Sequence, residues 1–136
     1  MPRTSPLRRL LLLAEALAML ALASLLIALL SFRRVAALSA SAAHTTPIAR
    51  DRAARIARAL AAWGARVPWR AVCFQQGLAA QLMLRRRGLA AALHYGAACD
   101  EAGQLVAHVW VRSGDVDVIG CEQAPRFGLL AVFPPR

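Results

Sequence analysis

The chain has 136 residues, enough for one domain with a modest hydrophobic core. It carries 17 basic and 7 acidic residues, and the formal net charge of +10 favours acidic partners, nucleic acid or a membrane surface. Neither a zinc-finger spacing nor an aromatic–basic motif accompanies the arginines, so we expect no nucleic-acid binding.

Residues 10–32, "LLLLAEALAMLALASLLIALLSF", form an apolar segment long enough to cross a bilayer, and three interpretations of it stay open. A signal peptide is disfavoured, because the run is longer than a normal h-region and Arg33 and Arg34 interrupt the approach to the small residues at 40–42. A transmembrane helix would contain Glu15 near one end, and the arginines on both sides give it no clear orientation. The third interpretation is a hydrophobic helix that docks on the domain, on a partner or on a membrane surface.

Residues 35–47, "VAALSASAAHTTP", are small and polar, which predicts a linker. The chain therefore divides into an N-terminal hydrophobic helix with its linker, residues 1–47, and a folded domain over residues 48–136. Free thiols at three positions fit a reducing compartment, so we expect a cytoplasmic protein that associates with a membrane if residues 10–32 reach one.

Two helices are predicted at the start of the domain. Apolar residues recur at helical spacing over residues 48–64, and Gly64 is a suitable stop. The second helix is expected to begin at Pro68 or Trp69 and to end at Arg87. The three arginines of its last turn suit the negative end of the helix dipole.

The pattern then changes to short β segments. Strands are predicted at residues 89–98, 105–112, 116–120 and 127–133, because these runs alternate or are rich in β-forming residues and are separated by turns. The predicted fold class is α+β, in which two helices are followed by an antiparallel meander and a helix packs on one face of the sheet.

Three cysteines, Cys73, Cys99 and Cys121, are too few and too widely spaced for a disulfide framework, and no CxxC pair indicates a structural zinc site. Cys73 differs from the other two because it falls in or near the first turn of a predicted helix, where the positive end of the dipole favours a thiolate. Cys99 falls in a polar turn and Cys121 at a strand end, so neither is expected to be catalytic.

His108 lies in a predicted strand 35 residues after Cys73, and Asp117 lies on the next strand. If the hairpin turns near Gly114, a carboxylate on that strand can orient the imidazole, as a Cys–His–acid triad requires. Asp115 and Glu122 are alternatives for the acid. A purely structural interpretation of Cys73 and His108 also stays open, since a cysteine on a helix is usually packed in the core and a strand histidine is often structural. His94 is expected to be a structural or surface residue.

The blocks "PWRAVCFQQGLAAQLMLRRRGLAAALHYG", "AHVWVRSGDVDVIG" and "RFGLLAVFPP" resemble the transglutaminase-like leader peptidases of lasso-peptide biosynthesis, the peptidase half of the maturation B protein. The resemblance covers about residues 50–136 and implies a papain/transglutaminase-like fold. It further implies that Cys73 is the nucleophile and His108 the base. The family's acid lies on the strand after the histidine, where Gly120 stands in this sequence, so Asp117 is the nearest candidate.

The resemblance also implies partners. The enzyme would cut the leader from a precursor peptide, with a separate leader-binding protein presenting the leader and a cyclase using the released amine. The family's maturation is associated with ATP, but the chain contains no P-loop, so we expect it to hold no cofactor itself and any nucleotide to bind elsewhere. No metal site is expected either.

Two other functions are compatible with the same residues. A non-catalytic assembly or membrane-adaptor module could use the fold with Cys73 merely packed. An acyl-transferring enzyme of the transglutaminase type would use the same thiol but deliver the acyl group to an amine.

Overall fold

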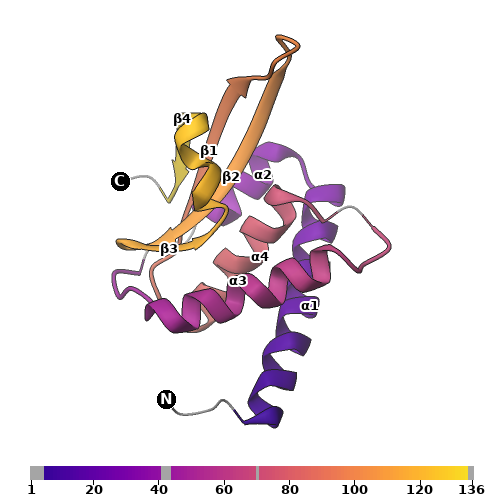
Figure 1. Ribbon diagram of the computed structural model, residues 1–136, viewed down its shortest axis with the longest axis vertical. Helices are drawn as coiled ribbons and strands as arrows, with labels where there is room; N and C mark the ends of the chain where they lie inside the picture. Colours follow the sequence, from indigo (N-terminus) through magenta and orange to yellow (C-terminus); the bar gives the residue numbers. More distant parts are fainter. Residues whose placement is uncertain (1–4, 41–43, 70, 135–136) are drawn as a thin grey trace.

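The computed structural model describes residues 5–40, 44–69 and 71–134. Helices come first and strands follow, which confirms the predicted α+β fold class (Figure 1). The helices are α1 (Pro6–Leu29), α2 (Phe32–Ser39), α3 (Arg50–Gly64) and α4 (Cys73–Arg86). The strands are β1 (Ala92–Cys99), β2 (Leu105–Ser113), β3 (Val116–Ile119) and β4 (Gly128–Phe133), with a 3₁₀ segment, η1 (Cys121–Arg126), before the last.

The apolar N-terminal segment forms α1, and a second helix, α2, follows it directly. Ser5 caps α1 by accepting a hydrogen bond from Arg8 N at 3.2 Å, and Ser31 caps α2 in the same way. The prediction of a linker from residue 35 was wrong over the part that α2 occupies, because Ser39 is buried and its hydroxyl lies 2.6 Å from Gln81 Oε1 of α4. The middle of the predicted linker, residues 41–43, lies outside the described residues.

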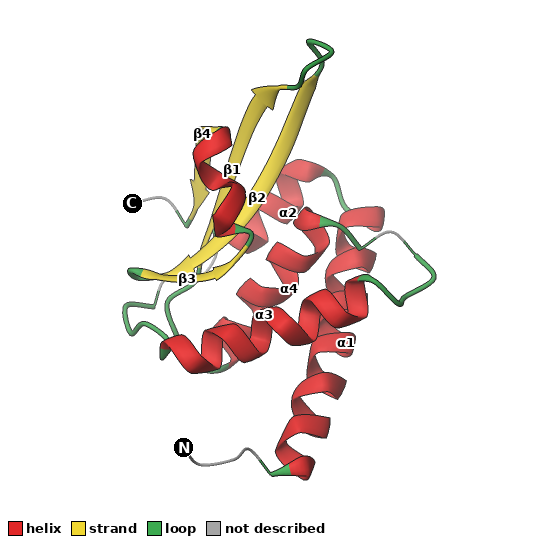
Figure 2. Ribbon diagram, in the orientation of Figure 1, coloured by secondary structure: helices red, strands yellow, loops and turns green. Residues whose placement is uncertain are grey.

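α1 packs on α3 and α4, as the docked-helix interpretation of the apolar segment expects. Its buried face carries Ala16, Leu20 and Ala23. By length and composition alone α1 would also be able to span a bilayer. Figure 2 shows α1 crossing behind α3, with its first turns extending beyond the other helices.

The three arginines at the end of α4 hold the N-terminal helices in place. Glu15 of α1 accepts hydrogen bonds from Arg86 at 2.6 Å and from Arg87 at 2.6 and 2.9 Å. Arg85 donates to the carbonyls of Leu38, at 2.6 Å, and Ser39 at the end of α2. The run is therefore a tertiary clamp in addition to being favourable charge at the end of its own helix.

α4 begins at Cys73, several residues later than the sequence predicted. The residue before it, Val72, is extended (φ −95°, ψ −163°), and Val67 to Trp69 form a bend instead of a first helical turn. Trp69 turns back to α1, where its indole N–H donates to Ser24 Oγ at 3.0 Å. The consequence is that Cys73 is the first residue of α4 rather than part of its second turn.

The described residues form one four-stranded antiparallel sheet of order β3-β2-β1-β4. The predicted meander is correct for β1, β2 and β3 but wrong for β4, which pairs with β1. The reason is η1, which follows β3 and carries the chain over the sheet to its other edge (Figure 1).

The core surrounds α4, which also packs on α1 and α3, and the part of it that positions the site lies between α4 and the sheet. The buried residues there are Leu78, Ala79, Ala80, Met83 and Leu84 of α4 together with Leu93, Val109 and Val111 of the sheet. Gly77 allows the close approach, because a Cβ at this position would lie 2.7 Å from Val109 Cγ1. This contact sets the distance between the start of α4 and strand β2.

Candidate active site

A cavity of about 420 Å³ opens between the start of α4, helix α3 and the edge of the sheet. Its lining consists of Ala57, Arg58 and Ala61 of α3, Cys73 and Gln76 of α4, His108 and Val109 of β2, and Val118, Ile119, Gly120 and Glu122 around the end of β3. The walls are mostly small and apolar, and the groups able to carry charge or exchange protons are few. The structure thus brings the two main predicted residues, Cys73 and His108, to one cavity.

Cys73 presents a half-buried thiol at the N-terminus of α4. The first hydrogen bond within the helix runs from Gln76 N to the Val72 carbonyl at 3.0 Å, so the amides of residues 73–75 precede the helical ladder. Val72 has no side-chain acceptor to cap them. Backbone N–H groups at a helix N-terminus attract negative charge, which suits both a thiolate and an oxyanion formed next to it.

His108 is held firmly in the sheet. Its side chain is 7% exposed and lies between the rings of Trp110 and Phe127, whose centroids are 5.9 and 5.0 Å away. Nε2 lies 2.8 Å from the carbonyl oxygen of Gly120. A carbonyl oxygen can only accept a hydrogen bond, so Nε2 carries a proton and the neutral imidazole has Nδ1 as its acceptor.

Gly120 makes this contact through an unusual backbone conformation. Its φ is +76°, in the left-handed region that favours glycine. A Cβ there would lie 2.8 Å from the Val109 carbonyl oxygen and 3.2 Å from His108 Nε2. A side chain at position 120 would therefore crowd both the Val109 carbonyl and the His108 ring.

Cys73 and His108 reach the cavity from different layers. Trp110 and His108 share the face of β2 that η1 covers, whereas Val109 faces α4. Pairing between β2 and β3 begins only at Val111 and Ile119, so the cavity lies at the sheet edge where β2 continues past the end of β3. No hydrogen bond joins the thiol to the imidazole in the described part of the chain; such bonds often tighten only in the substrate complex.

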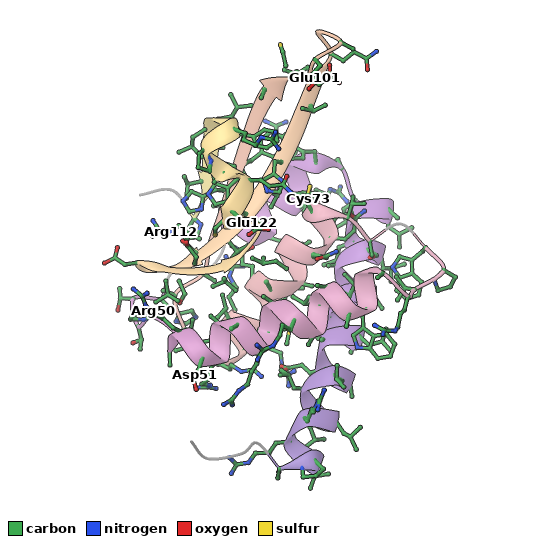
Figure 3. All side chains as sticks on the ribbon, viewed as in Figure 1. Arg50, Asp51, Cys73, Glu101, Arg112 and Glu122 are labelled. Carbon is green, nitrogen blue, oxygen red and sulfur yellow. The ribbon has the colours of Figure 1, made fainter. Side chains whose placement is uncertain are left out.

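The predicted acid, Asp117, lies elsewhere. Its carboxylate accepts a hydrogen bond from Arg112 Nε at 2.9 Å and its side chain is 65% exposed. The register of the hairpin is the reason: Asp117 lies opposite Arg112 of β2 and pairs with it, and Asp117 is not among the residues that line the cavity. Figure 3 shows Arg112 away from Cys73, which lies at the start of α4. Of the acids considered, Glu122 is the one that lines the cavity, and the group that contacts the imidazole is the Gly120 carbonyl.

A model of the transglutaminase-like superfamily matches residues 16–131. The chain belongs to this superfamily. Its fold commonly serves cysteine peptidases and acyl transferases. The match begins inside α1, so it includes most of the apolar helix as well as the domain predicted over residues 48–136. Neither the curated proteins nor the solved structures give a significant match.

Two further polar side chains line this transglutaminase-like site. From the sequence, Gln75 and Gln76 were both candidates for a second oxyanion donor because they lie near Cys73, and Arg58 was given no role. Gln76 lines the cavity, whereas Gln75 is not among the lining residues, and the Gln76 amide donates to the Ala71 carbonyl at 2.9 Å. Arg58 also lines the cavity, although in sequence it is one of several arginines on the polar side of α3. Only the position of α3 beside the end of β3 distinguishes it from its neighbours.

The remaining thiols and His94 have other surroundings. Burial and the nearby Asp117 carboxylate raise the pKa of the Cys121 thiol to about 11, so it stays protonated at neutral pH. Cys99 is exposed at the end of β1. His94 is buried and stacks on Trp110 at 5.5 Å. Among the described residues, no group of three or more His, Cys, Asp or Glu side chains could hold a metal ion.

Proposed function

We propose that this member of the transglutaminase-like superfamily is a cysteine peptidase that removes the leader from a ribosomally made lasso-peptide precursor. The observation that carries the chemistry is a thiol at a helix N-terminus sharing a cavity with an imidazole held in one tautomer. The substrate class rests on the resemblance of the blocks around Cys73 and His108 to the lasso leader peptidases.

The reaction follows from the protonation states. His108 Nδ1 takes the proton of the Cys73 thiol, and the thiolate sulfur attacks the scissile carbonyl carbon. The resulting oxyanion accepts hydrogen bonds from backbone N–H groups at the start of α4. The C–N bond then breaks as His108 gives its proton to the leaving amine, which becomes the N-terminus of the core peptide. Water, deprotonated by His108, attacks the thioester and releases the leader with a free carboxylate.

In this proposal the orienting group behind His108 is the carbonyl of Gly120 rather than a carboxylate. The 2.8 Å contact fixes the tautomer and the ring orientation, which are two tasks of the acid in a triad. A neutral carbonyl adds no full negative charge to stabilise the imidazolium. Asp117, paired with Arg112, contributes to the sheet surface instead.

The proposed partners are the precursor peptide, a separate leader-binding protein and the lasso cyclase, in the cytoplasm. ATP, which the family's maturation involves, would be used by one of these partners. The small, mainly apolar cavity fits a short stretch of peptide around the scissile bond and leaves recognition of the leader to the binding protein.

The first test is cleavage of the precursor by the full chain together with the leader-binding protein, followed by mass spectrometry. Cys73→Ala should abolish formation of free leader and core, whereas Cys99→Ala, which removes an exposed thiol, should cleave like the unaltered chain. Cleavage by Cys73→Ala at the normal rate would contradict the proposal. An amine-linked product in place of the free leader carboxylate would indicate acyl transfer instead.

One observation favours the non-catalytic adaptor as the second candidate. The thiol and the imidazole are not hydrogen-bonded in the described residues, and the group behind the imidazole is uncharged. A thiol-reactive probe separates the two functions, because an activated Cys73 should react faster than the more exposed Cys99 despite its partial burial. Equal or slower reaction of Cys73 would favour the adaptor.

A further inference from the structure

One face of α1 is fixed to the domain. Ala16, Leu20 and Ala23 are buried, and the Glu15 carboxylate, only 14% exposed, is held by two arginines of α4. The indole N–H of Trp63 adds a hydrogen bond to the Leu13 carbonyl at 2.8 Å. Together with the contact between Trp69 and Ser24, these bonds attach the helix along much of its length.

The opposite face of α1 is an exposed apolar stripe. Its large side chains have exposed fractions between 40% and 72% and follow one another at intervals that keep them on one side of the helix: Leu7, Leu11, Leu22, Leu25 and Leu29. Exposed alanines fill the interval between Leu11 and Leu22. The helix has 24 residues and is about 36 Å long, so this stripe is far more extensive than the scattered apolar residues of an ordinary surface.

Positive charge surrounds the stripe. Arg8 and Arg9 stand at its first turn and Arg33 and Arg34 at its end, all exposed. The first 50 residues contain a single acid, Glu15, which already has its partners. Two hollows flank the first half of α1: one of about 650 Å³ is lined by Arg9, Arg55 and Arg58 with leucines and alanines, and one of about 480 Å³ by Arg8, Arg86, Arg87, Glu15 and leucines.

We propose that the exposed face of α1 docks on an anionic lipid bilayer, with the helix axis in the plane of the surface and the domain above it. Apolar side chains between cationic ones are the pattern of an interfacial helix. The hollow lined by Arg8, Arg86 and Arg87 also contains Leu11 of the stripe, so it lies where lipid phosphates would meet the protein. The helix does not span the bilayer, because insertion would separate Glu15 from Arg86 and Arg87 and remove a face of the core. This surface is independent of the proposed peptidase activity.

Flotation of the full chain with unilamellar vesicles tests the proposal. The chain should float with vesicles of phosphatidylcholine and phosphatidylglycerol, bind neutral phosphatidylcholine vesicles more weakly, and be released by salt. The double variant Leu22→Glu/Leu25→Glu should lose roughly tenfold or more of the binding. Arg33→Gln/Arg34→Gln should lose roughly fivefold per arginine on the anionic vesicles alone.

The matched control is Leu105→Glu/Leu130→Glu, which alters two leucines on the sheet that are more exposed than Leu22 and Leu25 and should bind like the unaltered chain. Circular dichroism checks that each variant is folded. Normal binding by the α1 variant would overturn the proposal, as would retention of the chain in vesicles after alkaline carbonate, since that indicates a spanning helix. A dimer that the α1 substitutions dissociate, without vesicle binding, would assign the stripe to a second copy of the chain and also overturn it.

Discussion

At the scale of single residues, the site depends on how His108 is held. Side-chain rings bound it on two sides and a backbone carbonyl fixes its proton. The carbonyl is available only because Gly120 adopts a left-handed conformation that directs it toward the ring. Substitution at position 120 should therefore affect the histidine more than removal of a nearby carboxylate does.

Gly120→Ala should lower precursor cleavage by roughly tenfold or more, because its Cβ enters the space beside His108 Nε2 and displaces the ring. Gly103→Ala is the matched control, since Gly103 has nearly the same φ, +77°, but no atom within 4 Å of an added Cβ. It carries the same backbone strain without the crowding. Similar activity of both variants, compared at equal folded fraction, would refute the role of Gly120.

Asp117→Asn should leave cleavage within about twofold of the unaltered chain, because its exposed ion pair with Arg112 contributes little. Initial cleavage rates measured at several precursor concentrations check this. A large loss of kcat with unchanged stability would restore Asp117 to the site and contradict the assignment of the Gly120 carbonyl.

The sequence predicted the two side chains that meet at the cavity, Cys73 and His108, but not the group that contacts the imidazole. Cys73 and His108 are recognisable because their residue types carry the chemistry and their spacing is that of a known family. A backbone acceptor has no such signature: every residue has a carbonyl, and only the chain path through Gly120 directs this one at the imidazole. Arg58 was missed for a related reason, since its position at the cavity depends on how α3 packs beside β3.

At the scale of the elements, the contact between α4 and β2 positions the thiol relative to the imidazole. Gly77 lies one turn after Cys73 and touches Val109, the residue next to His108. Both the helix and the strand were predicted from periodicity, but the predicted start of α4 was too early. Pro68 resembles the first residue of a helix, and the hydrogen bond that turns Trp69 back to α1 is a tertiary contact that local sequence does not reveal. The order of the sheet was likewise beyond local patterns, since η1 carries β4 to the far edge.

Gly77→Ala should destabilise the fold by about 1 kcal/mol, because an overpacking cost of about 1–3 kcal/mol exceeds the gain in helix propensity of up to about 1 kcal/mol. In a Val109→Ala background the clash is absent, so the same substitution should become stabilising. Urea denaturation measures both. Gly128→Ala, whose Cβ would meet only the Ala97 carbonyl at an ordinary 3.6 Å, is the control. Stabilisation by Gly77→Ala in both backgrounds would contradict the proposed contact.

At the scale of the whole molecule, the charged clamp joins the N-terminal helix to the rest of the fold. Composition predicted an apolar helix and left its location open. Glu15 seemed out of place in an apolar run, and the arginine triplet was explained by its own helix; the pairing between them spans more than 70 residues and emerges only in three dimensions.

Glu15→Gln should lower the free energy of unfolding by about 1–2 kcal/mol, because it leaves two arginines with a weaker acceptor at a partly buried position. Glu101→Gln makes the same change of net charge in an exposed turn and should have almost no effect. Chemical denaturation measures both, and combination with Arg87→Gln should be less than additive if the clamp is the cause. Equal stability of the two single variants would argue against it.

The clamp also has a geometric meaning. Glu15 holds the end of α4, while Ser24, further along α1, receives Trp69 just ahead of α4, so the two helices run in opposite directions and are tied near both ends. Because α4 is attached to α1 near both of its ends, it cannot rotate relative to α1. A bilayer that binds the exposed face of α1 would therefore also set the height and direction of the opening beside Cys73 above its surface.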